Sequence, residues 1–229
     1  MNFRYTHYLF FICTVVVGFC ACNKSNNDAP DPVAQPANLA FINIIPEAPT
    51  INMYFNGTRQ NGNKIAYLES SGYLSVPSEQ QNVSFKDTTY TQIQEASLTL
   101  KPDSNYTMFV TGDYVANAPN PVSTILTANA EPHPTGKPKL RFVNAAPGSP
   151  SLDVYLNSLV LSNKAYKSVS GYALADSGAV AVKVNIAGTS NTILNATITL
   201  SSNSVYTFFS YGLINQTGVK AFNVGLIQN

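Results

Sequence analysis

One stretch of sequence occurs twice in this chain, and this repeat constrains the fold more than any other feature. Residues 39–56 read LAFINIIPEAPTINMYFN and residues 140–157 read LRFVNAAPGSPSLDVYLN. Each copy has an apolar segment, an Asn, a turn with two prolines three residues apart, and a second segment of alternating character. A repeat of about 100 residues predicts two modules of one fold, each of roughly immunoglobulin size.

Side-chain alternation predicts that both modules consist of β-strands. In the second module, apolar residues recur at every other position through residues 180–186 and 194–200, and the first module shows the same pattern more weakly at 83–85 and 96–100. No stretch of useful length has a helical period. We therefore predict an all-β protein with two tandem immunoglobulin-like antiparallel β-sandwich domains.

A tyrosine in the first module has the spacing of a tyrosine corner. Residues 100–106 read LKPDSNY, so that Tyr106 begins a strand and can return its hydroxyl to the backbone of the preceding connection. Tyr206 has the same spacing from Leu200 but lacks the proline, and an ordinary strand tyrosine explains it equally well. We expect Tyr106 to form the corner and treat Tyr206 as its counterpart.

The first 21 residues have the three parts of an export signal. Arg4 precedes an apolar run over residues 8–19, which is shorter than the roughly 20 residues a bilayer span needs, and Ala21 precedes Cys22. Residues 19–22, FCAC, resemble the lipidation motif of bacterial lipoproteins. Because bulky Phe19 directly precedes Cys20, we predict that Cys22 becomes the lipidated first residue and carries palmitate-type acyl chains that anchor the protein in a membrane.

Two spacers divide the mature chain. Residues 22–38 are rich in Asn, Asp, Pro and Ala, which predicts a flexible tether, and residues 129–138 contain three prolines that exclude a helix or a central strand. The expected domains are therefore 39–128 and 139–229, each folding by itself. Cys13 and Cys20 leave with the leader, so no thiol remains for a disulfide and both domains depend on packing.

The repeated motif resembles a known module. The sequence FVNAAPGSPSLDVY at 142–155, with SVSGY at 168–172 and the segment 200–206, is similar to the module called domain of unknown function 4397; the first copy differs in having Ile44 and Ile45 for the two alanines and Asn52 for the aspartate. The resemblance implies a β-sandwich at the cell envelope of Gram-negative bacteria, with no assigned activity.

Charge and motif content exclude several classes of function. The sequence has 13 basic and 12 acidic residues, and removal of the leader takes Arg4 with it. The mature chain is then formally neutral, so a nucleic-acid partner is not expected. The mature chain has one histidine, His133, between two prolines, and lacks the motifs of metalloproteases, serine hydrolases and nucleotide-binding loops. Asp153 and Asp176 are the carboxylates considered for glycosidase chemistry. We expect no enzyme, no metal and no cofactor.

The remaining candidates for function are tyrosines. Tyr54 and Tyr155 should point outward from equivalent strands, and further tyrosines lie near turns, so a tyrosine patch could stack on sugar rings or anchor a protein. The alternative is that these rings cover a neighbouring strand or the other domain. The patch comprises Tyr54, Tyr73, Tyr155, Tyr172 and Tyr211. Asn43 and Asn144, which precede the double-proline turns, are expected to hydrogen-bond the turn backbone.

These features predict a non-catalytic lipoprotein of the outer membrane, on either its periplasmic or its surface side, whose modules bind a protein or a glycan. The alternative is a structural subunit of a surface assembly that polymerises by strand addition.

The lipid assignment can be tested by fractionation. Cys22→Ala should release the protein from membranes into the soluble fraction, because the acyl anchor is lost, whereas Cys20→Ala should leave it in the membrane fraction. Membrane attachment that survives Cys22→Ala would refute the assignment.

Overall fold

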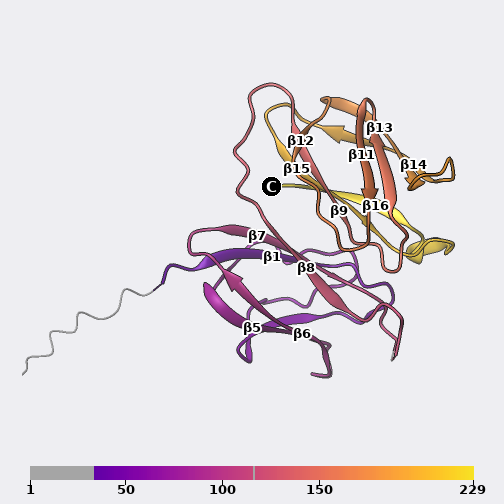
Figure 1. The fold of residues 1–229 in the computed structure, drawn as a ribbon. Helices are drawn as coiled ribbons and strands as arrows, with labels where there is room; N and C mark the ends of the chain where they lie inside the picture. Colours follow the sequence, from indigo (N-terminus) through magenta and orange to yellow (C-terminus); the bar gives the residue numbers. More distant parts are fainter. Residues whose placement is uncertain (1–33, 116) are drawn as a thin grey trace, which may run out of the picture. The chain divides into compact units, whose positions relative to one another are not determined.

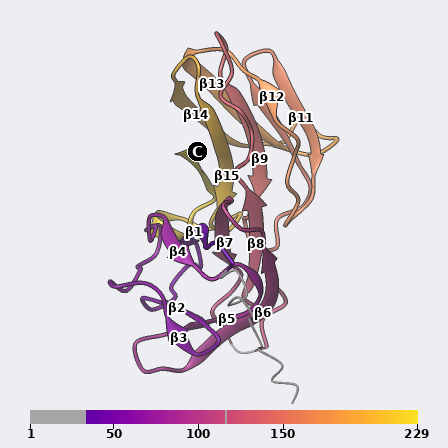
Figure 2. The ribbon, with the colours of Figure 1, turned by 90° about the vertical axis from the view of Figure 1, so that its left-hand side faces the viewer.

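The computed structural model describes residues 34–115 and 117–229, shown in Figures 1 and 2. The leader, Cys22 and most of the predicted tether lie outside these residues. Within them, the chain forms sixteen strands and one short 3₁₀ helix, Gly218–Lys220. The all-β prediction is confirmed. Among the described residues, no helical segment has the length and hydrophobicity that a bilayer span requires.

The first eight strands build two four-stranded sheets (Figure 1). One sheet has the order β4-β1-β7-β8 and the other β3-β2-β5-β6. Their bounds are β1 Ala37–Asn43, β2 Asn52–Phe55, β3 Thr58–Arg59, β4 Leu74–Val76, β5 Glu79–Lys86, β6 Gln92–Leu100, β7 Asn105–Thr111 and β8 Ser123–Ala128.

The last eight strands repeat this arrangement (Figure 2). The sheet orders are β12-β9-β15-β16 and β11-β10-β13-β14, so that each strand has its counterpart eight strands earlier. Their bounds are β9 Lys139–Asn144, β10 Leu152–Leu156, β11 Leu159–Lys164, β12 Ala173–Leu174, β13 Gly178–Ile186, β14 Thr192–Leu200, β15 Val205–Tyr211 and β16 Asn223–Gln228. The sequence repeat is therefore a repeat of the whole strand order.

Each module contains one parallel strand pair among otherwise antiparallel neighbours. β1 lies parallel to β7, and β9 lies parallel to β15. After β1, the double-proline turn takes the chain to the other sheet, where β2 begins. This eight-stranded order differs from the seven-stranded order of immunoglobulin constant domains, in which both sheets are antiparallel.

Each module has its own hydrophobic core between its two sheets. In the first core, the rings of Phe41 and Phe85 meet at 5.4 Å between centroids, and in the second those of Phe142 and Phe208 meet at 5.6 Å. The valines that alternate along β13 are buried in the second core. Period-two alternation thus identified the core face of this strand correctly.

Both modules contain a tyrosine hydroxyl that accepts a backbone hydrogen bond at the start of the seventh strand. The N–H of Lys101 donates to the Tyr106 hydroxyl at 3.0 Å, and the N–H of Ser201 donates to the Tyr206 hydroxyl at 3.0 Å. Both tyrosines are buried, at 7% and 4% exposure. The second copy makes this bond without the proline that precedes Tyr106 in the first.

The two hydroxyls should therefore contribute similarly to stability. Tyr206→Phe should lower the free energy of unfolding by about 1 kcal/mol, as should Tyr106→Phe, because each change leaves a backbone N–H without its partner. Urea denaturation of the chain from residue 23 to 229 measures both effects. If Tyr106→Phe lowered the free energy of unfolding and Tyr206→Phe did not, the hydroxyl would contribute to stability only where the proline is present.

Candidate functional site

The five tyrosines of the predicted patch lie in separate places and do not form one surface. Tyr54 on β2 and Tyr155 on β10 point outward, but lysine side chains lie over their rings, with Nζ to centroid distances of 4.9 Å for Lys86 and 4.4 Å for Lys183. Tyr54 is only 7% exposed. Tyr211 packs against the ring of Phe209 at 6.0 Å. These three rings therefore cover neighbouring parts of the structure and do not form an open patch.

The other two tyrosines converge on one arginine. The Asn129 side-chain amide donates to the Tyr73 hydroxyl at 2.7 Å, and the Asn229 amide donates to the Tyr172 hydroxyl at 3.0 Å. The Arg141 guanidinium lies 4.9 Å from the centre of the Tyr172 ring and donates to the side-chain oxygen of Asn129. Equivalent tyrosines of the two modules are thus linked through Arg141.

Arg141 is a buried cation that connects the modules. It is 4% exposed, and its guanidinium donates to the Thr207 hydroxyl at 2.9 Å and to the carbonyl of Ala128 at 2.7 Å. Burial lowers the pKa of Arg141, while the nearby Tyr172 acts in the opposite direction. Because Ala128 ends β8 and Arg141 lies in β9, the bond to the Ala128 carbonyl holds the second module's first strand to the first module's last one.

A third hydrophobic cluster joins the two modules, and we call it the junction cluster. Phe109 and Phe209, equivalent residues of β7 and β15, stack with centroids 5.0 Å apart. The Thr111 hydroxyl donates to the carbonyl of Ala145 at 2.6 Å. The cluster comprises Ile42, Ile44, Phe109, Ile125, Val143, Ala145 and Phe209, all buried. It covers the faces of β1, β7, β9 and β15 that point away from their own cores.

The asparagines before the double-proline turns bond the turns themselves. The side-chain oxygen of Asn144 accepts from the N–H of Ala146 at 3.4 Å and from the hydroxyls of Ser149 and Ser210 at 3.1 and 2.9 Å. Asn43 likewise accepts from the backbone N–H two residues further on, at 3.2 Å. Both asparagines are fully buried. These geometries leave no free amide for a ligand at either position.

Each double-proline turn contacts a loop of the other module. In the first turn, Glu47 forms an ion pair with Lys220, which ends the 3₁₀ helix in the loop before β16. In the second turn, Gly148 has φ of 63°, and a Cβ placed there would lie 2.6 Å from the side-chain nitrogen of Asn120 in the loop before β8. The left-handed backbone therefore favours glycine at this position, and a larger residue would displace the Asn120 side chain.

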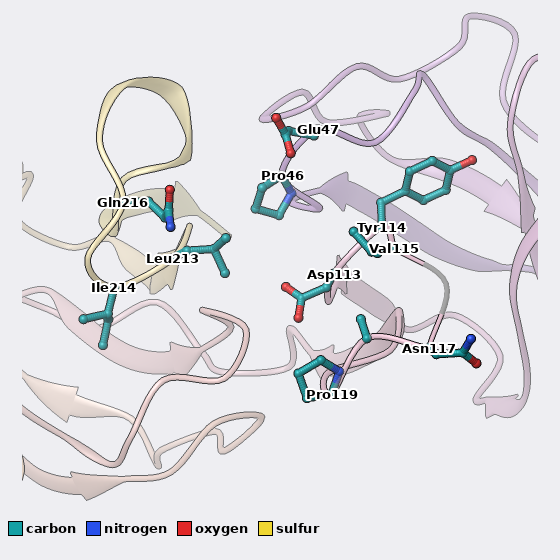
Figure 3. Close-up of a pocket in the computed structure, with 11 residues that line it drawn as sticks. Pro46, Glu47, Asp113, Tyr114, Val115, Asn117, Pro119, Leu213, Ile214 and Gln216 are labelled. Carbon is teal, nitrogen blue, oxygen red and sulfur yellow. The ribbon is translucent and has the colours of Figure 1, made fainter.

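A hollow of about 560 Å³ lies where the first turn meets these loops (Figure 3). The side chains of Pro46, Asp113 and Leu213 face the same space in Figure 3. Its lining combines apolar residues with amides and carboxylates, among them Pro46, Glu47, Asp113, Tyr114, Val115, Pro119, Leu213, Ile214 and Gln216. The junction therefore creates a composite hollow to which both modules contribute.

A second hollow of about 580 Å³ shares residues of the β7–β8 loop with the first. Tyr114 and Val115 line both hollows, although they are 37% and 69% exposed. Gln92 at the start of β6 and Pro121 contribute to the second hollow. Tyr114 and Val115 thus border two concave surfaces while remaining exposed.

Asp87 holds Tyr114 and lies beside a further exposed aromatic ring. Its carboxylate accepts from the Tyr114 hydroxyl at 3.4 Å and from the Thr89 hydroxyl and the backbone N–H groups of Thr89 and Thr91 at 2.7 to 2.9 Å. The Thr89 hydroxyl is the largest cause lowering the pKa of Asp87, so the group stays ionised. Tyr90, in the same turn, is 75% exposed. We define the Tyr114 surface as Tyr114, Val115 and the two hollows, together with Tyr90, which lines a neighbouring hollow beside Arg59 and Lys64.

The repeated sequence pattern did not predict this surface. Residues equivalent to Tyr114 and Val115 in the second module are Ile214 and Asn215, by the register of β7 and β15 with β1 and β9. Most tyrosines of the predicted patch have a tyrosine at the matching place in the other module, whereas Tyr114 has none. Aromatic residues found in only one copy were the signal that could have located it.

The carboxylates considered for catalysis have structural partners. The Asp153 carboxylate accepts from the backbone N–H groups of Asn163 and Gly188 at 2.7 and 2.9 Å, and these bonds lower its pKa. Asp176 forms an ion pair with Lys137 at 2.9 Å. His133 contacts the carbonyl of Asn203 at 3.2 Å. Across residues 34–115 and 117–229, no group of His, Cys, Asp and Glu residues is arranged to hold a metal.

The fold defines a tandem β-sandwich protein in which two copies of one module pack through a shared cluster. The chain belongs to the family described as domain of unknown function (DUF4397), which matches residues 37–155 and 138–223. The resemblance seen in the repeated motif is therefore confirmed.

The sequence matches no curated protein. Among solved structures, the chain is similar to the CBM26 module CBMbc from Eubacterium rectale Amy13K in complex with maltoheptaose, with 10% identity and a TM-score of 0.24 over 83% of this chain and 96% of that chain. At this TM-score, the likeness bears on neither fold nor ligand.

The role of Arg141 at the junction can be tested by replacement. Arg141→Leu should lower the free energy of unfolding by about 2 kcal/mol, because three acceptors lose a charged donor. Urea denaturation measures the change, and Arg59→Leu, which alters an exposed arginine, should change it by less than about 0.5 kcal/mol. Equal effects of the two substitutions would contradict a special role for Arg141.

Proposed function

We propose that this protein is a non-catalytic cell-envelope lipoprotein, anchored in the outer membrane through Cys22, that binds a glycan on the Tyr114 surface. The observation that carries the proposal is that Tyr114 and Val115 are exposed and line both hollows. An aromatic face beside amide and carboxylate groups can stack on a sugar ring while its polar neighbours bond the hydroxyls.

Charge in the two hollows favours neutral sugars. Of the residues that line the two hollows, none is a lysine or an arginine. The carboxylate of Glu47 is paired with Lys220, and that of Asp113 accepts from the side-chain amide of Asn120 at 3.2 Å. A uronate or phosphate group would meet these acids with no cation lining the hollows to balance its charge.

The structural contacts of the acids near the Tyr114 surface fit a binding role. Inverting and retaining glycosidases both need two carboxyl groups that face one substrate, one of them a proton donor. Asp87 lies beside the Tyr114 surface, but its hydrogen bonds hold it in the ionised state. Glu47 and Asp113 are engaged with Lys220 and Asn120. The acids therefore act here as structural and hydrogen-bonding groups.

The test uses the chain from residue 23 to 229, which has no lipid, on arrays of neutral and acidic polysaccharides. We expect retention on neutral glycans, with affinity reduced about tenfold by Tyr114→Ala and by Tyr90→Ala, which corresponds to about 1.4 kcal/mol. Leu174→Ala, at a residue 58% exposed in the second module, is the matched control and should bind normally.

Two results would count against the proposal. Binding that survives both tyrosine substitutions would move the site elsewhere. Retention of no glycan, together with capture of an envelope protein that depends on Tyr114, would assign the same surface to a protein partner.

A further inference from the structure

β14 is a long sheet edge that has one neighbour. In the order β11-β10-β13-β14, the nine-residue strand Thr192–Leu200 pairs with β13, and among the described residues no strand pairs with its other side. Figure 2 shows β14 beside β13 in the second module. An edge of this kind presents a row of backbone donors and acceptors that can pair with another strand.

The sequence of β14 lacks the charged residues and prolines that usually protect an edge. TILNATITL contains no charged residue, no proline and no glycine, and most of its residues are β-branched or apolar. Edge strands of soluble proteins are commonly protected by lysine, proline, bulges or short length. Here the edge is open over most of its nine residues, with its one register shift at the end, near Thr192.

The apolar side of β14 is incompletely covered. Leu194, Ala196 and Ile198 pack against the second core, yet each remains partly exposed. Val224 and Leu226 of β16 are also only partly buried against this core. An added strand would extend the sheet and cover the apolar side chains of β14.

The strand is complementary to itself. In an antiparallel pair centred on Ala196, this residue lies opposite its own copy, Leu194 lies opposite Ile198, and Asn195 lies opposite Thr197. Over residues 194–198, apolar residues then meet apolar residues, polar residues meet polar ones, and no like charges are opposed, while further out Ile193 lies opposite Thr199 and Thr192 opposite Leu200. We propose that two copies of this chain associate through antiparallel β14–β14 pairing, which joins two four-stranded sheets into one of eight strands.

The equivalent edge in the first module lacks this property. β6 has nine residues, but Glu95 occupies the position of Asn195. Hydrogen bonds from Asn82 and Gln92, the first being the largest cause, lower the pKa of Glu95, so this edge carries a charge. Self-pairing of β6 would bring two carboxylates close together.

A strand that pairs with itself forms an isologous contact, which closes at a dimer and does not propagate.

The mass of the chain from residue 23 to 229 in solution tests the pairing. Analytical ultracentrifugation over a wide concentration range should show a monomer–dimer equilibrium. The double substitution Asn195→Glu with Thr197→Glu should abolish the dimer, because carboxylates then oppose one another across the pair. Ser97→Glu, which creates the same two-glutamate pattern on β6 beside the natural Glu95, is the matched control and should leave the dimer intact.

A cysteine substitution reports the register. The chain from residue 23 has no cysteine, so Ala196→Cys introduces a single thiol, which should give a disulfide-linked dimer under oxidising conditions. Ala96→Cys on β6 should remain unlinked.

The proposal fails if the chain is a monomer at every concentration, or if a dimer persists in the Asn195→Glu, Thr197→Glu variant. A ladder of higher oligomers would also overturn it, and would instead support the structural subunit that polymerises by strand addition. Glycan retention by the Tyr114 surface is measured separately and does not depend on any of these results.

Discussion

The rest of this structure depends on one constraint. A sheet face of the first module and a sheet face of the second are buried against each other at the junction cluster. Along β1, residues of both faces are buried: Phe41 enters the first core, and Ile42 enters the junction cluster. A strand that is apolar on both faces must be covered on both. The second module supplies that cover through Val143, Ala145 and Phe209. The hollow in Figure 3 exists because this contact brings loops of both modules together.

Repetition of the double-proline turn has a physical basis in this arrangement. The turn transfers the chain between the sheets of its own module, with Asn43 or Asn144 satisfying backbone and hydroxyl donors inside it. It also contacts the loop before the last strand of the other module, through Glu47 in one copy and Gly148 in the other. Differences between the copies, such as Arg141 in place of Ala40, give the junction its asymmetry.

Much of the fold followed from local pattern, while the candidate site did not. Alternation along β13 and β14 depends on the pleat of a single strand, so the sequence predicted it. The expected patch failed as a unit because nearness in space depends on sheet order. Tyr54 lies under Lys86, whereas Tyr73 and Tyr172 meet around Arg141. Tyr114 was missed because a loop residue without a counterpart leaves no periodic pattern.

By itself, the sequence determined that the chain contains two β-modules with the same strand order and predicted a lipidated cysteine ahead of them. These properties rest on short-range features: side-chain alternation, turn residues and an N-terminal apolar run. Only the tertiary structure decided which strands are buried on both faces, which tyrosines remain exposed and which edge strand lacks a second neighbour. Each of these depends on contacts between residues far apart in the chain, such as Phe109 with Phe209. The pattern of a short stretch of sequence does not reveal such contacts.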